Sequence, residues 1–235
     1  MKLYLIRHAD PDYANDTITT QGQLEARELA DRLVKEGINV IYSSPLGRAV
    51  ETASYAASKL NVEIQVEEWA RELQEVLSVP LDGYPSLHAF NLHGEEIRKD
   101  LSQMSYTDWH QLPHLQGTLM REEYERIAHH SDDFLKRLGY ERIDGRYRCV
   151  TPHRKKVAVF GHGGLFLTWL AHLLAIPLPL VWSGFWLPTT SVTTILFDER
   201  TPQWAVPRCI GVGDVSHLYR ANLPVLPRGI LANFD

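Results

Sequence analysis

Short apolar runs, separated by segments of mixed polarity, are the main pattern of the chain. The first run follows Met1 and stops at Arg7. Further runs lie at residues 38–42, 62–66, 156–160, 192–197 and 204–209. Runs of this length, several of them rich in β-branched residues, predict buried strands rather than helices.

The segments between the first three runs have the period of amphipathic helices. In the first segment Thr19 or Thr20 can cap a helix with one apolar stripe, and Gly37 can end it. A second helix is expected to open at Pro45 and to reach Leu60. This alternation of strands and helices predicts an α/β fold of three layers, α/β/α, in which a mostly parallel sheet is covered on both faces.

The pattern is irregular over residues 73–150, where prolines and glycines interrupt it and one helix is expected between residues 119 and 138. We interpret this region as a lid inserted into a single domain that spans residues 1–235. A buried helix is expected at residues 165–175 after the next strand. The prolines that follow it predict an irregular aromatic segment, which carries Trp182 and Trp186.

Composition and charge narrow the class of protein. The chain has 235 residues, is 44% hydrophobic and carries a formal net charge of -5, which is enough for a sizeable core and gives no basic field for nucleic acid. Two cysteines without metal or redox spacing favour a cytoplasmic protein. Residues 165–188 are apolar, but their prolines, His172 and Gly184 argue against a membrane span.

Candidate chemistry lies where three of the predicted strands end. Arg7 and His8 follow the first strand, Arg48 lies in the first turn of the helix after the second, and His162 follows the strand at 156–160. Because parallel strands present their carboxyl ends at one edge, these side chains are expected to share a pocket for an anion. Glu72, just past the third strand, is the candidate acid.

These residue types suit phosphoryl transfer. A neutral His8 imidazole, with its far nitrogen held by a backbone carbonyl, can attack phosphorus, while Arg7 and Arg48 bind the phosphate oxygens. His162 and the amide of Gly163 can hold the charge that develops on those oxygens. Six other histidines lack metal-ligand spacing or a suitable carboxylate beside them, so no metal site is expected: His88, His93, His110, His114, His129 and His130.

Over nearly its whole length the chain resembles the histidine phosphatase superfamily, in the branch that includes the cofactor-dependent phosphoglycerate mutases. Three further segments carry the resemblance beside Arg7 and His8: Thr19 with Gly22; Ser43, Ser44, Pro45, Arg48, Glu51 and Thr52; and His162 with Gly163. The resemblance implies that His8 is phosphorylated and that Arg7, Arg48 and His162 complete the phosphate pocket. It places the general acid at the pair Arg71 and Glu72, and it implies no metal and no other cofactor.

The chain also departs from the family pattern. Ala9 stands where the family usually has glycine, Glu75 competes with Glu72 for the acid, and the segment at 120–124 is acidic where the mutases carry an arginine for the substrate carboxylate. We therefore expect a metal-independent phosphatase for phosphomonoesters. The alternatives are a phosphoglycerate mutase and a catalytically idle phosphate-binding module. The substrate can be a small phosphorylated molecule or a phosphopeptide, and the sequence does not predict an oligomeric state.

Overall fold

The computed structural model describes residues 1–73, 88–230 and 233. Its centre is a sheet of eight strands in the order β5-β4-β8-β1-β9-β10-β7-β6. The strands are β1 (Lys2–Arg7), β4 (Val40–Ser43), β5 (Ile64–Val66), β6 (Tyr140–Ile143), β7 (Arg146–Cys149), β8 (Lys156–Gly161), β9 (Val192–Thr201) and β10 (Trp204–Asp214). A separate two-stranded ladder joins β2 (Pro11–Asp12) to β3 (Thr17–Ile18).

The sheet is parallel in one half and antiparallel in the other. Strands β5, β4, β8 and β1 pair in parallel, whereas β9, β10, β7 and β6 pair antiparallel from β1 outward. The mixed sheet agrees with the predicted α/β class. The second and third strands and the second helix each begin two residues later than the pattern indicated; the helix expected to open at Pro45, for example, starts at Gly47.

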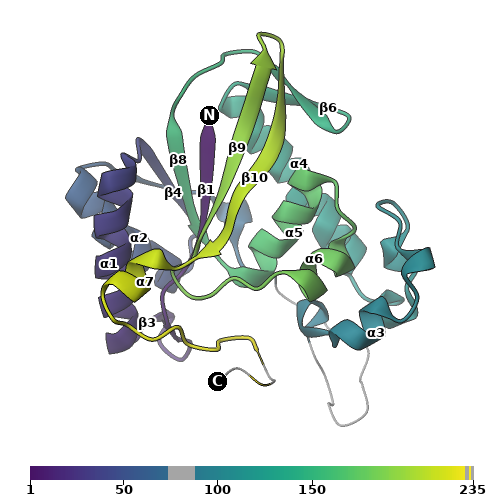
Figure 1. Cartoon of the computed structure of the whole chain (residues 1–235), viewed down its shortest axis with the longest axis horizontal. Helices are drawn as coiled ribbons and strands as arrows, with labels where there is room; N and C mark the ends of the chain where they lie inside the picture. Colours follow the sequence, from purple (N-terminus) through teal and green to yellow (C-terminus); the bar gives the residue numbers. More distant parts are fainter. Residues whose placement is uncertain (74–87, 231–232, 234–235) are drawn as a thin grey trace.

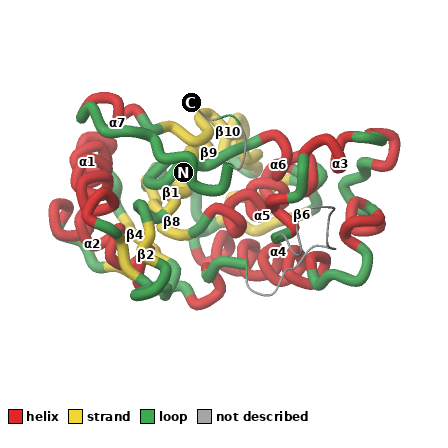
Figure 2. The backbone as a smooth tube through the Cα atoms, turned by 90° about the horizontal axis from the view of Figure 1, so that it is seen from below, coloured by secondary structure: helices red, strands yellow, loops and turns green. Residues whose placement is uncertain are grey.

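Helices cover both faces of the sheet, as predicted (Figure 1, Figure 2). Their bounds are α1 (Thr20–Glu36), α2 (Gly47–Leu60), α3 (Gly94–Arg98), α4 (Met120–Arg137), α5 (Gly163–Leu174), α6 (Leu178–Gly184) and α7 (Ser216–Arg220). In the described part of the chain, single-turn 3-10 helices lie at residues 68–70, 89–91, 101–103, 109–111 and 113–115.

The two faces have different cores. Tyr4 and Ile6 of β1 point toward α1 and α2, and Leu3 and Leu5 point toward α4 and α5, because successive side chains of a strand face opposite ways. The helix ends follow the sequence signals: Thr19 accepts a hydrogen bond from the Gly22 amide at the start of α1. Gly37 ends the same helix at φ +71°, a conformation that glycine adopts without strain.

Two predictions about connecting segments are wrong. The last part of the expected lid, residues 140–149, forms the hairpin of β6 and β7 and belongs to the sheet. The segment after Pro177 is irregular only in its last part: α6 begins there and contains Trp182, whereas Trp186 lies beyond α6 in a stretch without helix or strand. A proline in the first turn of a helix removes no internal hydrogen bond, so these prolines start a helix instead of only ending one.

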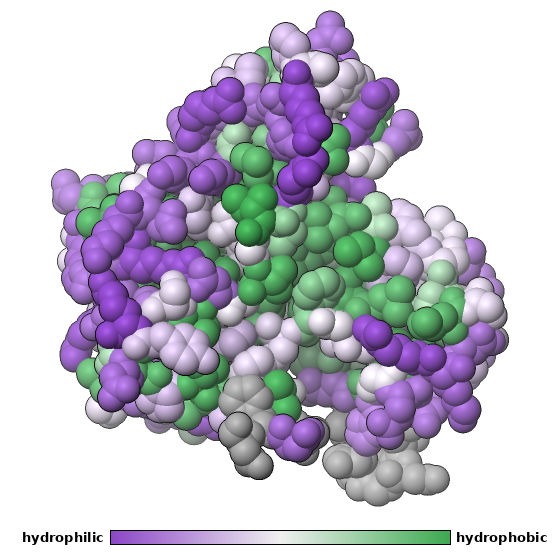
Figure 3. Space-filling view, viewed as in Figure 1, coloured by the Kyte–Doolittle hydropathy of each residue, from purple (hydrophilic) through white to green (hydrophobic). Residues whose placement is uncertain are grey.

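The outer surface of β10 is partly apolar. Val206, Ile210 and Val212 are each more than a third exposed, and Figure 3 shows hydrophobic residues gathered over β10 and the neighbouring helices α5 and α6. Among the described residues no helix is both long and apolar enough to cross a membrane. The apolar stretch at 165–188 is divided between α5 and α6, and most of it is buried in the core.

Candidate active site

His8 lies immediately after β1, where the parallel half of the sheet ends. Its ring is buried, and its Nδ1–H donates to the carbonyl of Ala9 at 2.7 Å. Burial, together with the positive charge of Arg7, lowers the pKa of His8 to about 3. The imidazole is therefore neutral at physiological pH. Since Nδ1 is occupied as a donor, Nε2 is the nitrogen with a free lone pair.

Arg7 is buried beside His8 and is held by backbone carbonyls. Its Nη1 donates to the carbonyl of Leu187 at 2.6 Å and to that of Arg228 at 3.2 Å. Its Nε is buried and forms no hydrogen bond within the described part of the chain. The guanidinium is thus held in place through Nη1, and its other N–H groups can donate to an anion.

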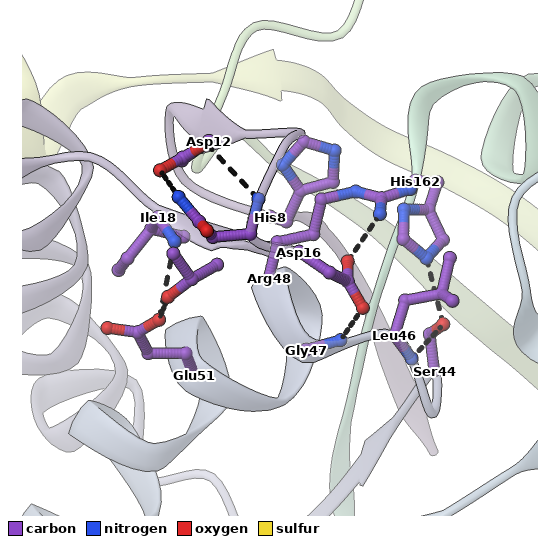
Figure 4. Close-up of polar contacts among 12 residues, drawn as sticks. His8, Asp12, Asp16, Ile18, Ser44, Leu46, Gly47, Arg48, Glu51 and His162 are labelled. Carbon is purple, nitrogen blue, oxygen red and sulfur yellow. Dashed lines mark hydrogen bonds and ion pairs between the residues drawn. The ribbon is translucent and has the colours of Figure 1, made fainter.

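Arg48 is the second residue of α2, and Asp16 fixes its position. One carboxylate oxygen of Asp16 accepts from Nη1 of Arg48 at 2.7 Å, and the other accepts from the Gly47 amide, also at 2.7 Å (Figure 4). A Cβ on Gly47 would lie 2.1 Å from the Asp16 carbonyl oxygen, so only glycine permits this approach. The guanidinium also lies 5.5 Å from the ring centre of Tyr13, and its buried Nε has no partner among the described residues.

His162 lies at the end of β8 as the N-cap residue of α5. Its ring centre is 5.2 Å from that of His8, and Figure 4 shows both imidazoles beside Arg48. The ring is fully buried, and its Nε2 lies 2.8 Å from Oγ of Ser44. Burial and the neighbouring His8 and arginines lower the pKa of His162 well below its usual value. This histidine is therefore also neutral.

Ser44 determines the tautomer of His162. The Leu46 amide donates to Ser44 Oγ, so the single hydroxyl hydrogen of Ser44 needs an acceptor, and Nε2 of His162 is the acceptor in range. If Ser44 donates to Nε2, the ring proton lies on Nδ1, which is buried and has no partner within the described residues. The reverse assignment would leave both the Ser44 hydrogen and the Nδ1 lone pair unsatisfied. His162 therefore presents an N–H.

In Ser44→Ala the His162 ring is expected to lose its preference for the Nδ1–H tautomer. The value of kcat/KM should fall roughly 10-fold, the effect of one lost hydrogen bond. The ¹⁵N shifts of His162 should move from the Nδ1–H pattern toward a mixture. Ser43→Ala is the matched control, because Ser43 Oγ donates to the Ser44 carbonyl and does not contact the ring. Unchanged ¹⁵N shifts in Ser44→Ala would contradict the assignment.

Glu72 follows the single turn at residues 68–70 and lies against the start of α5. Its Oε1 accepts from the amides of Leu73 and Leu165, both at 2.9 Å, and its Oε2 accepts from the Gly164 amide at 3.2 Å. A Cβ on Gly164 would lie 2.9 Å from Oε1, so the absence of a side chain there allows the carboxylate to approach. The amides at the start of α5 thus hold the carboxyl group at the edge of the cavity.

One cavity of about 670 Å³ brings most of these groups together. Arg7, His8, Arg48, Glu72 and Gly163 all line it. His162 is not among the residues that line it, but its ring lies next to that of His8, with the ring centres 5.2 Å apart. Three buried donors in this region form no hydrogen bond to the described residues: Nε of Arg7, Nε of Arg48 and Nδ1 of His162. Groups of this kind are suited to bind the oxygens of an oxyanion.

The structure thus brings together Arg7, His8, Arg48 and His162, and places Glu72 at the same cavity. The rival acid, Glu75, lies outside the described residues. Within the described residues no group of three His, Cys, Asp or Glu side chains is arranged to hold a metal ion.

Sequence reasoning missed three positions that shape the site. Asp16 fixes Arg48, Ser44 orients His162, and Arg228 reaches the cavity from the C-terminal segment. Ser44 belongs to a motif that the sequence displayed, although its role depends on a contact across the sheet. No sequence spacing connects Asp16 or Arg228 to the site, because only the folded chain brings them there.

Comparison with known proteins agrees with the fold and the motifs. The profile of the histidine phosphatase superfamily (branch 1) matches residues 3–209. The chain belongs to this superfamily, which confirms the resemblance seen in the sequence. A putative phosphoserine phosphatase 2 from Hydrogenobacter thermophilus is 26% identical over 193 residues, which are 77% of this chain and 83% of the relative.

Two solved structures share the fold. A phosphoserine phosphatase from Entamoeba histolytica, in complex with 3-phosphoglyceric acid, has a TM-score of 0.62 and 24% identity over 92% of this chain and 98% of its own. A mycobacterial glucosyl-3-phosphoglycerate phosphatase has a TM-score of 0.56 and 19% identity over 90% of this chain and 97% of its own. These likenesses support the three-layer α/β architecture.

Proposed function

We propose that this protein is a metal-independent phosphatase that hydrolyses phosphomonoesters through a phosphohistidine on His8. The observation that carries the proposal is the neutral, buried His8 beside three buried donors, on Arg7, Arg48 and His162, that have no partner among the described residues. Together they provide a nucleophile and a set of phosphate ligands in one place. Two guanidinium groups supply the positive charge that a phosphoryl group requires.

In the first step Nε2 of His8 attacks phosphorus, and the bond between phosphorus and the ester oxygen breaks. Glu72 donates a proton to that oxygen, so the alcohol leaves neutral. Oε1 of Glu72 already accepts two backbone hydrogen bonds and Oε2 only one, so Oε2 is the oxygen that exchanges the proton. Arg7, Arg48 and the Nδ1–H of His162 bind the remaining phosphate oxygens as their negative charge changes.

In the second step Glu72, now ionised, takes a proton from water. The water oxygen attacks phosphorus, the bond from phosphorus to Nε2 breaks, and inorganic phosphate is released. The Nδ1–H bond to the Ala9 carbonyl keeps the His8 ring in one orientation through both steps. The proton that Glu72 donated in the first step is thereby restored.

Several observations favour hydrolysis over the alternatives. The relatives that match this chain include phosphatases for phosphoserine and for a phosphoglycerate derivative. The arginine of the segment at 120–124, Arg121, pairs with Glu125 and His110 and does not line the cavity, so it offers no second arginine for a mutase substrate. An idle phosphate receptor would not require Glu72 to be held beside the cavity by three amides.

Replacing Glu72 with glutamine tests the proposal through the intermediate. An aryl phosphate has a good leaving group and needs little acid assistance, so this variant is expected to release about one equivalent of phenolate rapidly. It should then stall for lack of a base, with kcat lowered about 100-fold or more.

The stalled protein should carry a phosphoryl group on His8, detected as an acid-labile mass increase. Wild-type turnover should be unaffected by a chelator. Turnover that a chelator abolishes, or a stalled protein without phosphohistidine, would overturn the mechanism. Isomerisation of a phosphoglycerate with little phosphate release would support the mutase alternative. Binding of phosphate without any turnover would support the idle module.

A further inference from the structure

The C-terminal segment after α7 forms a wall of the catalytic cavity. In Figure 1 this segment crosses below the lower ends of the strands, and Arg228, Gly229 and Ile230 line the cavity. The carbonyl of Arg228 accepts from Nη1 of Arg7 at 3.2 Å and from Nε1 of Trp186 at 3.1 Å. The segment is therefore attached directly to one of the arginines assigned to the phosphate.

The side chain of Arg228 is anchored by only one of its nitrogens. Its Nε donates to Asp10 at 2.6 Å, and the Asp10 carboxylate is almost completely buried, also accepting from the Thr19 hydroxyl at 2.7 Å. The Arg228 side chain is 48% exposed. Its two terminal amino groups form no hydrogen bond or ion pair with the residues that the structure describes. They can therefore bind an anion at the cavity wall.

We propose that Arg228 binds a carboxylate of the substrate, so that the preferred substrates are small phosphorylated carboxylic acids. This proposal rests on the phosphatase function given above. Arg7 binds the Arg228 carbonyl and both residues line the cavity, so a substrate with only a few bonds between its carboxylate and its phosphate would reach both arginines. A planar guanidinium with two free amino groups matches a carboxylate.

The charge around the cavity supports one carboxylate rather than a second phosphate. Three arginines line the described part of the cavity: Arg7, Arg48 and Arg228. With Arg7 and Arg48 assigned to the phosphoryl group, Arg228 is the remaining arginine of this lining, and one guanidinium balances one negative charge. A bisphosphate would require additional cations.

The test compares two substrates that differ only by a carboxylate, O-phosphoserine and phosphoethanolamine. The wild type is expected to prefer O-phosphoserine in kcat/KM. In Arg228→Gln this preference should fall roughly 10- to 100-fold, mainly through KM, because a charge-assisted pair with the bound substrate is lost. Arg228→Lys should recover part of the preference, since lysine keeps the positive charge but lacks the planar group that donates two parallel hydrogen bonds to a carboxylate.

Asp10→Asn is the matched control for a purely structural role of Arg228. It weakens the anchor while keeping the guanidinium, and the preference should stay within about threefold of the wild type because the carboxylate ligand remains. A wild type without preference would overturn the proposal. So would an equal loss on both substrates in Arg228→Gln, or an Asp10→Asn variant that reproduces the loss of preference. Hydrolysis of an aryl phosphate is measured in parallel, and its absence in the wild type would instead contradict the phosphatase function.

Discussion

Replacing His8 with alanine is expected to lower kcat by about 10⁴-fold or more for every phosphomonoester, because no other group can form the covalent intermediate. His8 is buried and neutral, and its Nδ1–H bond to the Ala9 carbonyl directs Nε2 to the reaction. If water attacked the ester directly, the reaction would proceed without the imidazole nitrogen and without its fixed position beside the phosphorus. Initial rates with an aryl phosphate, together with a search for phosphorylated protein after rapid quenching, measure the loss.

His129→Ala is a matched control for this experiment. His129 lies on the exposed side of α4, with a side chain 73% exposed, and pairs only at the surface with Asp133. It should retain full activity. Thermal unfolding of His8→Ala distinguishes a lost nucleophile from a lost fold. Turnover within about 10-fold of the wild type in a folded His8→Ala protein would show that the reaction does not proceed through this residue.

The parallel half of the sheet and its site could be predicted from the sequence because local signals and topology agree. The cap at Thr19, the stop at Gly37 and the apolar runs specify where strands and helices alternate. Once the strands are parallel, their carboxyl ends meet at one edge, and His8, Arg48 and His162 must come together. The site follows from the topology, which is why residues more than a hundred positions apart could be assigned to one pocket.

In the antiparallel half, the outer hairpin of β6 and β7 was missed because these two strands are short and half exposed. Strands β6 and β7 each bury one tyrosine, Tyr140 and Tyr147, among charged residues, so neither shows an apolar run. A signal was present, since Asp144 and Gly145 form the hairpin turn and Asp144 has φ +56°. The pair Asp-Gly is a strong indicator of a tight hairpin. With this signal, the predicted lid would have ended before the hairpin instead of near residue 150.

Contacts made by exposed or terminal segments could not be predicted. Asp16 reaches Arg48 from a loop, and its left-handed backbone, with φ +48°, places its carboxylate at the start of α2. Arg228 reaches Asp10 from a segment without regular structure. Such pairs depend on the path of the backbone in space, and no periodicity in the sequence records that path.

The folded protein is expected to lose stability steeply as the pH falls from 6.5 to about 4.5. Burial lowers the pKa of His8 to about 3 and that of His217 to about 4, and it also lowers the pKa of His162. In the unfolded chain these groups titrate near 6.5. Below that pH the unfolded state binds about three protons that the folded state cannot bind. The stability that these neutral histidines provide is therefore fully present above pH 6.5, and it is lost as the pH falls toward their pKa values in the folded protein.

Glu25 opposes part of this effect. Burial raises its pKa to about 7, so between pH 4.5 and 7 the folded state holds one proton that the unfolded state has released. The difference near pH 5.5 is thus about two protons, and the free energy of unfolding should fall by roughly 2.5 kcal/mol for each pH unit. Urea denaturation at pH 7.0, 6.0, 5.5 and 5.0 measures this slope. His217→Gln removes one of the three imidazoles with lowered pKa named above, so the slope should decrease by about 1.4 kcal/mol per pH unit, whatever the absolute stability. The contrary result is a free energy of unfolding that stays constant or rises as the pH falls to 5.0. It would mean that these histidines take up protons in the folded protein. A neutral His8 could then not be the nucleophile at acidic pH.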